Sequence, residues 1–199
     1  MNSKLITNQD KALDILNCKY FIGSDSFGRV SQFRPSANGN AWFISKLKSE
    51  KNAKFEMESL KQINHKTEAT FNADFEANKK LKDADFTVDS LNKTELTSYH
   101  PDTLKYNVQN SNSGFLVFSE IYDQSWKAKI DGKPTDLYKV NYTLRGIEVP
   151  AGNHKIELYF EKTENKLKKY ELIFSSIILV AFLAQIILSI KSYLSHKEA

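Results

Sequence analysis

The residues that could do chemistry in this chain form no recognisable catalytic or metal-binding pattern. The four histidines are isolated in the sequence, and none has a partner at the spacing that zinc ligands use. The sequence contains no glycine-rich phosphate loop and no nucleophile elbow. Carboxylates occur in pairs, such as Glu56 with Glu58, and in a chain with 26% charged residues these are explained by a solvated surface. The sequence therefore predicts no catalytic residue, no cofactor and no metal ion.

Aromatic residues near predicted turns are better candidates for a binding site. Flat rings with polar groups beside them can stack on sugar rings. The predicted glycan-facing residues are Tyr122, Trp126, Asn141, Tyr142 and Arg145. The alternative, which is the commoner use of such rings, is an ordinary sandwich core with cross-strand aromatic pairs.

Repeated short strands are predicted from about Phe86 onward, because alternating or continuous apolar segments are separated by turn signals. The predicted strands are 94–99, 104–108, 115–121, 126–130, 137–142, 144–149 and 155–160. Asp131-Gly132 lies between two alternating segments and is a strong hairpin signal. This spacing predicts a mainly β fold, with an antiparallel β-sandwich or jelly-roll-like domain over residues 86–162.

Residues 1–85 are predicted to form a small α+β segment that packs on the β-domain. Residues 11–22 begin with a helical pattern and end with a strand pattern, and 23–29 is rich in turn residues. The segment 41–47 is a predicted strand and 51–63 a predicted helix.

An apolar segment near the C-terminus predicts one transmembrane helix over residues 172–190, followed by a short polar tail, 191–199. The segment contains no charged residue, and most of its side chains are Leu, Ile, Phe or Val. A helix of this length spans about 28 Å, close to the hydrocarbon thickness of about 30 Å. We therefore expect the lipid bilayer to be a partner. The positive-inside rule compares the lysines on the two sides of the helix. It leaves the orientation open here, because it weakens for long domains.

The overall charge excludes one class of partner. The net charge is +4 and is spread without a dense basic block, whereas nucleic-acid binders concentrate Lys and Arg on one face. We expect no nucleic-acid partner. The single cysteine, Cys18, rules out an intramolecular disulfide and lies in an apolar run, which is typical of a small buried residue.

Several short motifs in residues 114–160 occur together in one known family. They are Phe118–Glu120, Trp126–Ala128, Asp131-Gly132, Asn141–Arg145 and Val149–His154. In this stretch the chain resembles the C-terminal extracytoplasmic domain of the bacterial YfhO-type membrane proteins, and segments 13–22 and 39–44 resemble that family in the same order. The chain departs from the family pattern at Gln124-Ser125, where Pro-Gly is usual, and at Lys162, where proline is usual.

The resemblance implies a function for the whole family. These proteins are similar to GT-C glycosyltransferases, which use a polyprenyl-phosphate-linked sugar to modify polymers of the cell envelope. Their catalytic acid lies in an early extracytoplasmic loop that has no counterpart here, so no catalytic residue is carried over and we do not expect this chain alone to be an enzyme. The expected location is the bacterial cell membrane, with a single span and the β-domain outside.

Two functional hypotheses follow. In the first, the chain is the C-terminal extracytoplasmic β-domain and last helix of a YfhO-like protein, as a truncated or split piece whose partners are a polytopic membrane core and an envelope glycan. In the second, it is a stand-alone, tail-anchored module that binds a glycan or a protein.

Overall fold

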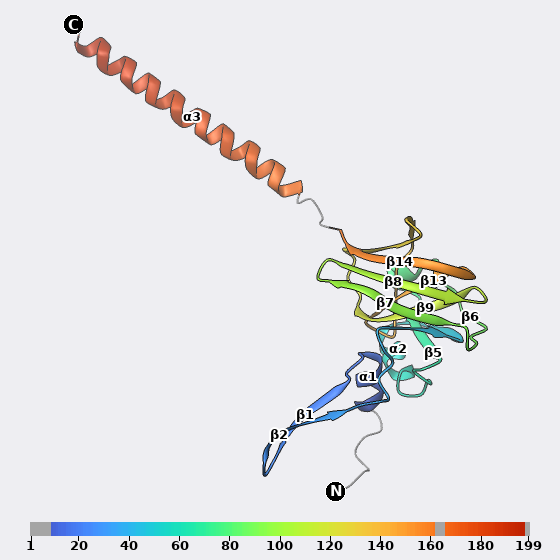
Figure 1. The fold of residues 1–199 in the computed structure, drawn as a ribbon. Helices are drawn as coiled ribbons and strands as arrows, with labels where there is room; N and C mark the ends of the chain where they lie inside the picture. Colours follow the sequence, from blue (N-terminus) through green and yellow to red (C-terminus); the bar gives the residue numbers. More distant parts are fainter. Residues whose placement is uncertain (1–8, 162–165, 198–199) are drawn as a thin grey trace. The chain divides into compact units, whose positions relative to one another are not determined.

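The computed structural model describes residues 9–161 and 166–197 and divides the chain into two units, Met1–Glu161 and Lys162–Ala199 (Figure 1). The strands are β1 (Tyr20–Asp25), β2 (Gly28–Phe33), β3 (Ala41–Ile44), β4 (Lys46–Glu50), β5 (Glu68–Asn72), β6 (Ala84–Asp85), β7 (Lys93–His100), β8 (Thr103–Asn110), β9 (Gly114–Ile121), β10 (Trp126–Ile130), β11 (Lys133–Thr135), β12 (Tyr138–Val140), β13 (Leu144–Val149) and β14 (Gly152–Phe160). The helices are α1 (Gln9–Ile15), α2 (Ala53–Ser59), the short 3-10 helix η1 (Glu76–Asn78) and α3 (Lys166–Lys197).

Two antiparallel sheets form a sandwich, which confirms the predicted mainly β fold. One sheet has the strand order β11-β10-β14-β8-β7 and the other has the order β12-β13-β9-β3. A buried apolar cluster lies between them, with side chains from both sheets such as Tyr106, Phe118, Ile147 and Leu158. The alternation predicted for the last strand is present at Ile156 and Leu158, which are buried.

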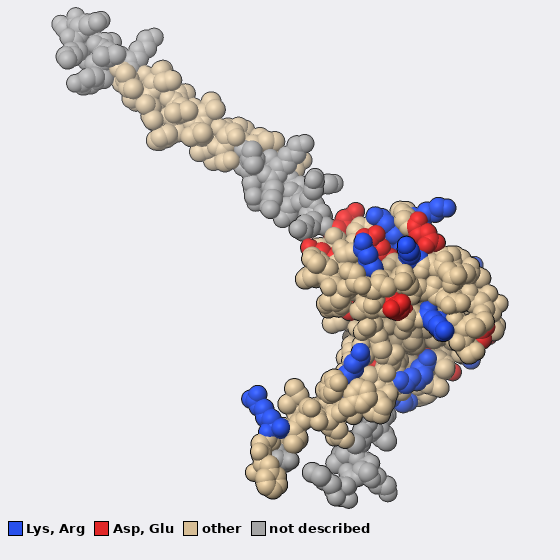
Figure 2. Space-filling model, viewed as in Figure 1, with Lys and Arg blue, Asp and Glu red and all other residues tan. Residues whose placement is uncertain are grey.

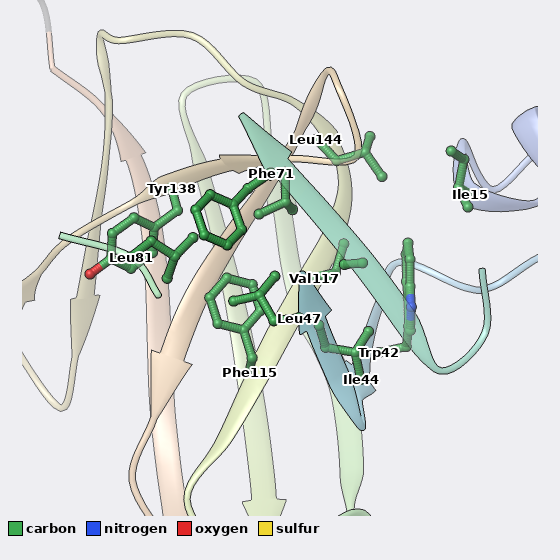
Figure 3. Close-up of a cluster of buried hydrophobic side chains, with 12 residues drawn as sticks. Ile15, Trp42, Ile44, Leu47, Phe71, Leu81, Phe115, Val117, Tyr138 and Leu144 are labelled. Carbon is green, nitrogen blue, oxygen red and sulfur yellow. The ribbon is translucent and has the colours of Figure 1, made fainter. Parts of the chain in front are cut away.

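A third layer covers the other face of the four-stranded sheet. It contains the small sheet β5-β4-β6, in which β4 and β5 are parallel. A second apolar cluster fills this interface and includes Phe71 and Leu47 from the small sheet and Phe115 and Val117 from β9 (Figure 3). Strand β9 is therefore buried on both faces, which explains its continuous apolar run.

The chain passes between these layers at Ser45, where the sequence predicted one continuous strand over 41–47. Strand β3 belongs to the sandwich and β4 to the small sheet, with Ser45 bent between them. The bend is fixed because the amides of Ser45 and Lys46 both donate to the carbonyl of Thr67, at 2.7 and 3.1 Å. Since β3 pairs with β9, the predicted boundary at residue 85 lies inside one compact unit.

Other predicted features differ in extent. The turn predicted at 23–29 is mostly strand, because β1 and β2 pair up to Asp25 and Gly28. The helix predicted at 51–63 is regular only over Ala53–Ser59, with Asn52 as its N-cap. Cys18, predicted to be buried, is only partly covered. The Asp131-Gly132 hairpin turn is present, with positive φ angles of 51° and 80°.

The second unit is the helix α3. Within the part of the chain that the structure describes, it contains the one helix long and apolar enough to cross a membrane, over Ile173–Ile190. The side chains of 173–190 are all exposed, and the length and composition of this segment are those of a candidate membrane span. The helix continues to Lys197, so most of the predicted polar tail is helical. Lys162, where the family pattern has proline, lies outside the described residues.

The edge of β12 is buried under the third layer, and an asparagine side chain makes hydrogen bonds to the backbone groups along this edge. Asn78, at the end of η1, accepts from the Lys139 amide at 3.0 Å and donates to the Lys139 carbonyl at 2.7 Å. It also donates to the Asn72 carbonyl at 3.0 Å. The side-chain amide therefore pairs with the edge of β12 as a neighbouring strand would, and Asn78 itself is 1% exposed.

Replacing Asn78 by aspartate tests this role. The carboxylate keeps the shape but cannot donate to the two carbonyls, and it adds a charge at a buried position. We expect Asn78→Asp to lower the free energy of unfolding by about 3 kcal/mol in urea titrations of the detergent-solubilised chain. The control is Asn107→Asp on the exposed face of β8, which should change it by less than about 0.5 kcal/mol. Equal effects of the two variants would contradict the proposed pairing.

Candidate ligand-binding site

Four of the five residues predicted to face a glycan lie at one end of the four-stranded sheet, where β9 ends and β13 begins: Tyr122, Asn141, Tyr142 and Arg145. The fifth, Trp126, begins β10 of the other sheet and stacks on Arg145. The Tyr122 amide donates to the Thr143 carbonyl at 2.7 Å. The Arg145 Nε donates to the Ile121 carbonyl at 2.8 Å. These bonds bring the segment after β9 against the β12–β13 connection, so side chains from two separate stretches of the sequence share one region.

The β12–β13 connection has an unusual backbone. Asn141 and Tyr142 both have positive φ, 48° and 69°, and the Thr143 amide donates to the Asn141 carbonyl at 2.8 Å, as in a γ-turn. A positive φ is costly for a tyrosine, at about 1–3 kcal/mol, and persists only where neighbouring groups fix it. This geometry also explains why the strand predicted over 137–142 ends at Val140.

Asn141 is one of the groups that fix the turn. The backbone N–H of Asn141 donates to the Thr70 carbonyl at 2.7 Å, and its side-chain Oδ1 accepts from the backbone N–H of Thr70 at 3.0 Å. Thr70 lies in β5, so Asn141 joins the sandwich to the third layer. The side chain is 1% exposed, and the bonds it makes are to the protein's own backbone.

Glu56 is the second group that fixes the backbone of the β12–β13 turn. The prediction that it lies on the solvated surface is wrong. Its side chain points from α2 into the protein, is 2% exposed, and accepts from the Tyr142 amide at 2.7 Å. Burial raises the pKa of Glu56 to about 7, although the Tyr142 hydrogen bond and the nearby Lys139 charge act in the opposite direction. Its partner in the sequence pair, Glu58, is exposed as predicted.

Aromatic rings lie around the Lys139 ammonium at this end of the sheet. Lys139 Nζ lies 4.8 Å from the ring centre of Phe75 and 5.4 Å from that of Tyr142. Phe75 in turn makes an edge contact with Tyr122, with ring centres 5.6 Å apart. We call Phe75, Tyr122, Tyr142 and Lys139 the aromatic platform. Its most accessible ring is that of Tyr142, a residue that is 37% exposed.

Trp126 and Arg145 form a separate stack beside the platform. The Arg145 guanidinium lies 4.0 Å from the Trp126 ring centre, and Trp126 meets Phe160 edge-on at 5.9 Å. Arg145 is 4% exposed and Trp126 is half-buried. The buried arginine therefore presents a ring rather than its own charge to the surface.

An apolar pocket of about 280 Å³ adjoins the β12–β13 turn. Tyr142 lines it together with apolar side chains of α1, α2 and the residue after each helix, and Lys11, Lys61 and His65 add polar groups. The apolar lining residues are Ala12, Ile15, Leu16, Met57 and Leu60. The pocket could not be predicted from the sequence, because its two helical segments are far apart in the chain and neither one has a marked apolar stripe.

The site contains no arrangement typical of metal catalysis. Over residues 9–161 and 166–197, no group of three His, Cys, Asp or Glu side chains lies close enough to hold a metal ion. An accessible ring platform beside an apolar pocket is an arrangement suited to binding a ring-shaped or partly apolar ligand.

The raised pKa of Glu56 makes the stability of this site depend on pH. In the folded chain Glu56 holds a proton up to about pH 7, whereas an unfolded glutamate releases it near 4.5. The folded state therefore binds more protons between these values, so the free energy of unfolding falls as pH rises from about 4.5 to about 7. Its contribution over this range is at most about 3 kcal/mol.

The Glu56→Gln variant should lack this pH-dependent part of the free energy of unfolding, because glutamine still accepts from the Tyr142 amide but does not titrate. Urea titrations at a series of pH values measure the difference between wild type and variant. The matched control is Glu58→Gln, an exposed residue on the same helix. Parallel curves for wild type and Glu56→Gln would contradict the assignment.

A family model matches most of the chain. The family model described as bacterial membrane protein YfhO matches residues 38–191. No curated protein and no solved structure matches the chain. The matched region runs from the loop before β3 through the aromatic platform and includes the segment Ile173–Ile190, which is long and apolar enough to cross a membrane. The α1 residues that line the pocket precede the matched region. Since the match covers most of the chain, this protein belongs to the YfhO family of bacterial membrane proteins.

Proposed function

We propose that the β-rich unit is an extracytoplasmic domain that binds a glycan during the glycosylation of cell-envelope polymers. Family membership and the membrane span support a role at the bacterial membrane. The observation that carries the glycan is the aromatic platform, in which accessible rings lie beside an ammonium group and a pocket. A sugar stacks an apolar ring face on an aromatic side chain and offers hydroxyls to nearby polar groups.

The five predicted residues take two roles in this proposal. Tyr142, Tyr122 and Trp126 are the contact residues, because each ring is at least partly accessible. Asn141 and Arg145 are positioning residues. Asn141 holds the strained turn that presents Tyr142, and Arg145 supports the face of Trp126. Rings held in this way lose little side-chain freedom on binding, which favours affinity.

In this proposal the domain supplies binding and a membrane core supplies chemistry. A polytopic membrane partner would carry the transfer of sugar from a polyprenyl-phosphate donor, and the platform would help to shape the acceptor site beside it. The alternative is a tail-anchored module that binds its glycan or protein partner without such a core.

A topology measurement tests the location. A cysteine is placed at Lys133, which is exposed in the β10–β11 hairpin, in a Cys18→Ser background. We expect a membrane-impermeant maleimide to label this cysteine in intact cells. Labelling only after lysis would place the β-domain inside the cell and would refute the envelope proposal. A cysteine that labels in neither condition would reveal misfolding, and the cysteine would then be placed at Lys129 instead.

Binding of purified envelope glycans to the full chain in detergent tests the platform. Loss of the Tyr142 ring should weaken binding about three- to tenfold, which corresponds to one aromatic contact. Tyr122→Leu should weaken it as well, while avoiding any effect on the positive φ of residue 142. The control is Tyr99→Ala on β7, an exposed tyrosine outside the platform. Unchanged binding by folded Tyr142→Ala and Tyr122→Leu variants would exclude the platform as the glycan site.

A further inference from the structure

The β1–β2 hairpin projects from the body of the first unit as an isolated two-stranded ribbon (Figure 1). Such a ribbon is marginal in water by itself and gives little cover to its own side chains. It nevertheless carries large apolar residues that are strongly exposed: Tyr20 57%, Phe21 40%, Ile22 77%, Phe27 99%, Val30 45% and Phe33 57%. A concentration of exposed apolar side chains of this kind marks an interaction surface.

These apolar side chains lie on both faces of the ribbon and at its tip. The register pairs Tyr20 with Phe33 and Gly23 with Val30, so Tyr20, Ile22 and Phe33 share one face and Phe21 and Val30 share the other. Phe27 lies in the short turn between the strands. A flat protein surface would cover only one of these faces, whereas end-on entry into a soft apolar layer covers both faces and the tip together.

The base of the hairpin is fixed to the protein by a buried ion pair. Arg34, directly after β2, donates to Asp14 Oδ1 at 2.5 Å, and Ser36 Oγ donates to the same atom at 2.7 Å. The Arg34 amide donates to the Lys19 carbonyl at 2.7 Å, which closes the ribbon at its start. Burial alone would raise the pKa of Asp14, but the hydrogen bonds from Ser36 and Arg34 hold it below its usual value, so the pair stays ionised. The ribbon is therefore held outward from its base.

The charge on the hairpin favours a lipid surface. Residues 19–33 include two basic residues, Lys19 and Arg29, and one acidic residue, Asp25, and Figure 2 shows a basic group on the described surface of the hairpin. Basic side chains beside exposed aromatic and aliphatic residues are typical of segments that lie in the headgroup layer of a membrane. The chain also carries its own membrane span, Ile173–Ile190, so a bilayer is always close to this domain.

We propose that the tip of the β1–β2 hairpin inserts into the interfacial layer of the bilayer in which α3 is anchored, and so gives the domain a second membrane contact. The depth is limited, because open strand edges have unpaired backbone groups that cannot enter the hydrocarbon core. Insertion by about 5–10 Å covers Phe27 and the pairs nearest the tip, as far as Gly23–Val30, and leaves the Tyr20–Phe33 pair at headgroup level. Arg29 lies within the covered part, where its long side chain can extend to the headgroups. This contact does not depend on the proposed glycan site or on which leaflet the domain faces.

Fluorescence of the full chain in lipid nanodiscs tests the proposal. An environment-sensitive NBD probe is attached at Phe27→Cys in a Cys18→Ser background, with one chain per disc and equal parts of phosphatidylglycerol and phosphatidylcholine. We expect emission at shorter wavelength than from the same probe at Tyr99→Cys, and quenching by lipids with a nitroxide near the headgroup. Equal emission at the two positions, with no quenching at either, would overturn the proposal. A wavelength shift that appears only with two chains in one disc would also overturn it, because that result assigns the apolar surface to a dimer.

A further variant separates insertion from an effect of the probe. Ile22→Ser with Val30→Ser removes two apolar side chains near the tip and touches no buried core residue. It should reverse most of the wavelength shift at position 27 while the urea midpoint of the chain stays the same. Persistence of the full shift in this variant would show that the probe inserts on its own, and the proposal would then fail.

Discussion

The structure depends on satisfying the backbone edges that become buried where the third layer meets the sandwich. Strand β12 and strand β5 approach each other edge to edge without forming a regular ladder, so their polar groups need other partners. Two asparagines provide them. Asn78 reaches from η1 to both polar groups of Lys139, and Asn141 pairs with both polar groups of Thr70. The side-chain amide of Asn78 has both a donor and an acceptor, so it can replace one residue of a strand. Asn141 instead donates through its backbone N–H and accepts through its Oδ1.

This junction explains the unusual backbone at the candidate site. To pair with Thr70, the chain after β12 must turn at Asn141, and the turn brings Tyr142 into positive φ. The cost is offset by Glu56, which binds the Tyr142 amide from α2. A buried carboxyl with a pKa of about 7 is a consequence of this geometry, since the group must be buried in order to reach the amide. The exposed ring of Tyr142 is thus fixed by groups from two layers.

The sequence predicted best those parts of the fold in which a side-chain pattern is repeated along one segment. The apolar run of β9, the Asp131-Gly132 turn and the apolar C-terminal helix each have a local signal. The sequence did not predict structural features that depend on contacts between distant segments. Glu56 looks like any charged residue of a solvated helix, and only the approach of the β12–β13 turn explains its burial. The break at Ser45 likewise depends on Thr67, which lies beyond α2 in the sequence.

The same contrast applies to the candidate site. Residue type identified the five polar and aromatic candidates, and the fold brings four of them to one end of a sheet and the fifth, Trp126, onto Arg145. Type alone could not separate rings that face solvent from the buried Asn141 and Arg145 that hold them, because burial is decided by the third layer. The platform residue Phe75 and its cation Lys139 were missed for a related reason. Phe75 lies in a polar segment without periodicity, and its value as a binding surface arises only from Tyr122 and Lys139 beside it.

The N-terminal segment contributes more side chains to the candidate site than its lack of regular pattern suggests. It supplies Phe75 of the platform, the buried Glu56, the apolar wall of the pocket and the hairpin with its Asp14–Arg34 anchor. The sandwich supplies most of the buried apolar area and the rigid edges to which these groups attach. The segment is held to the sandwich by a shared apolar cluster, which includes Phe71 and Phe115, and by the polar contacts at its junctions.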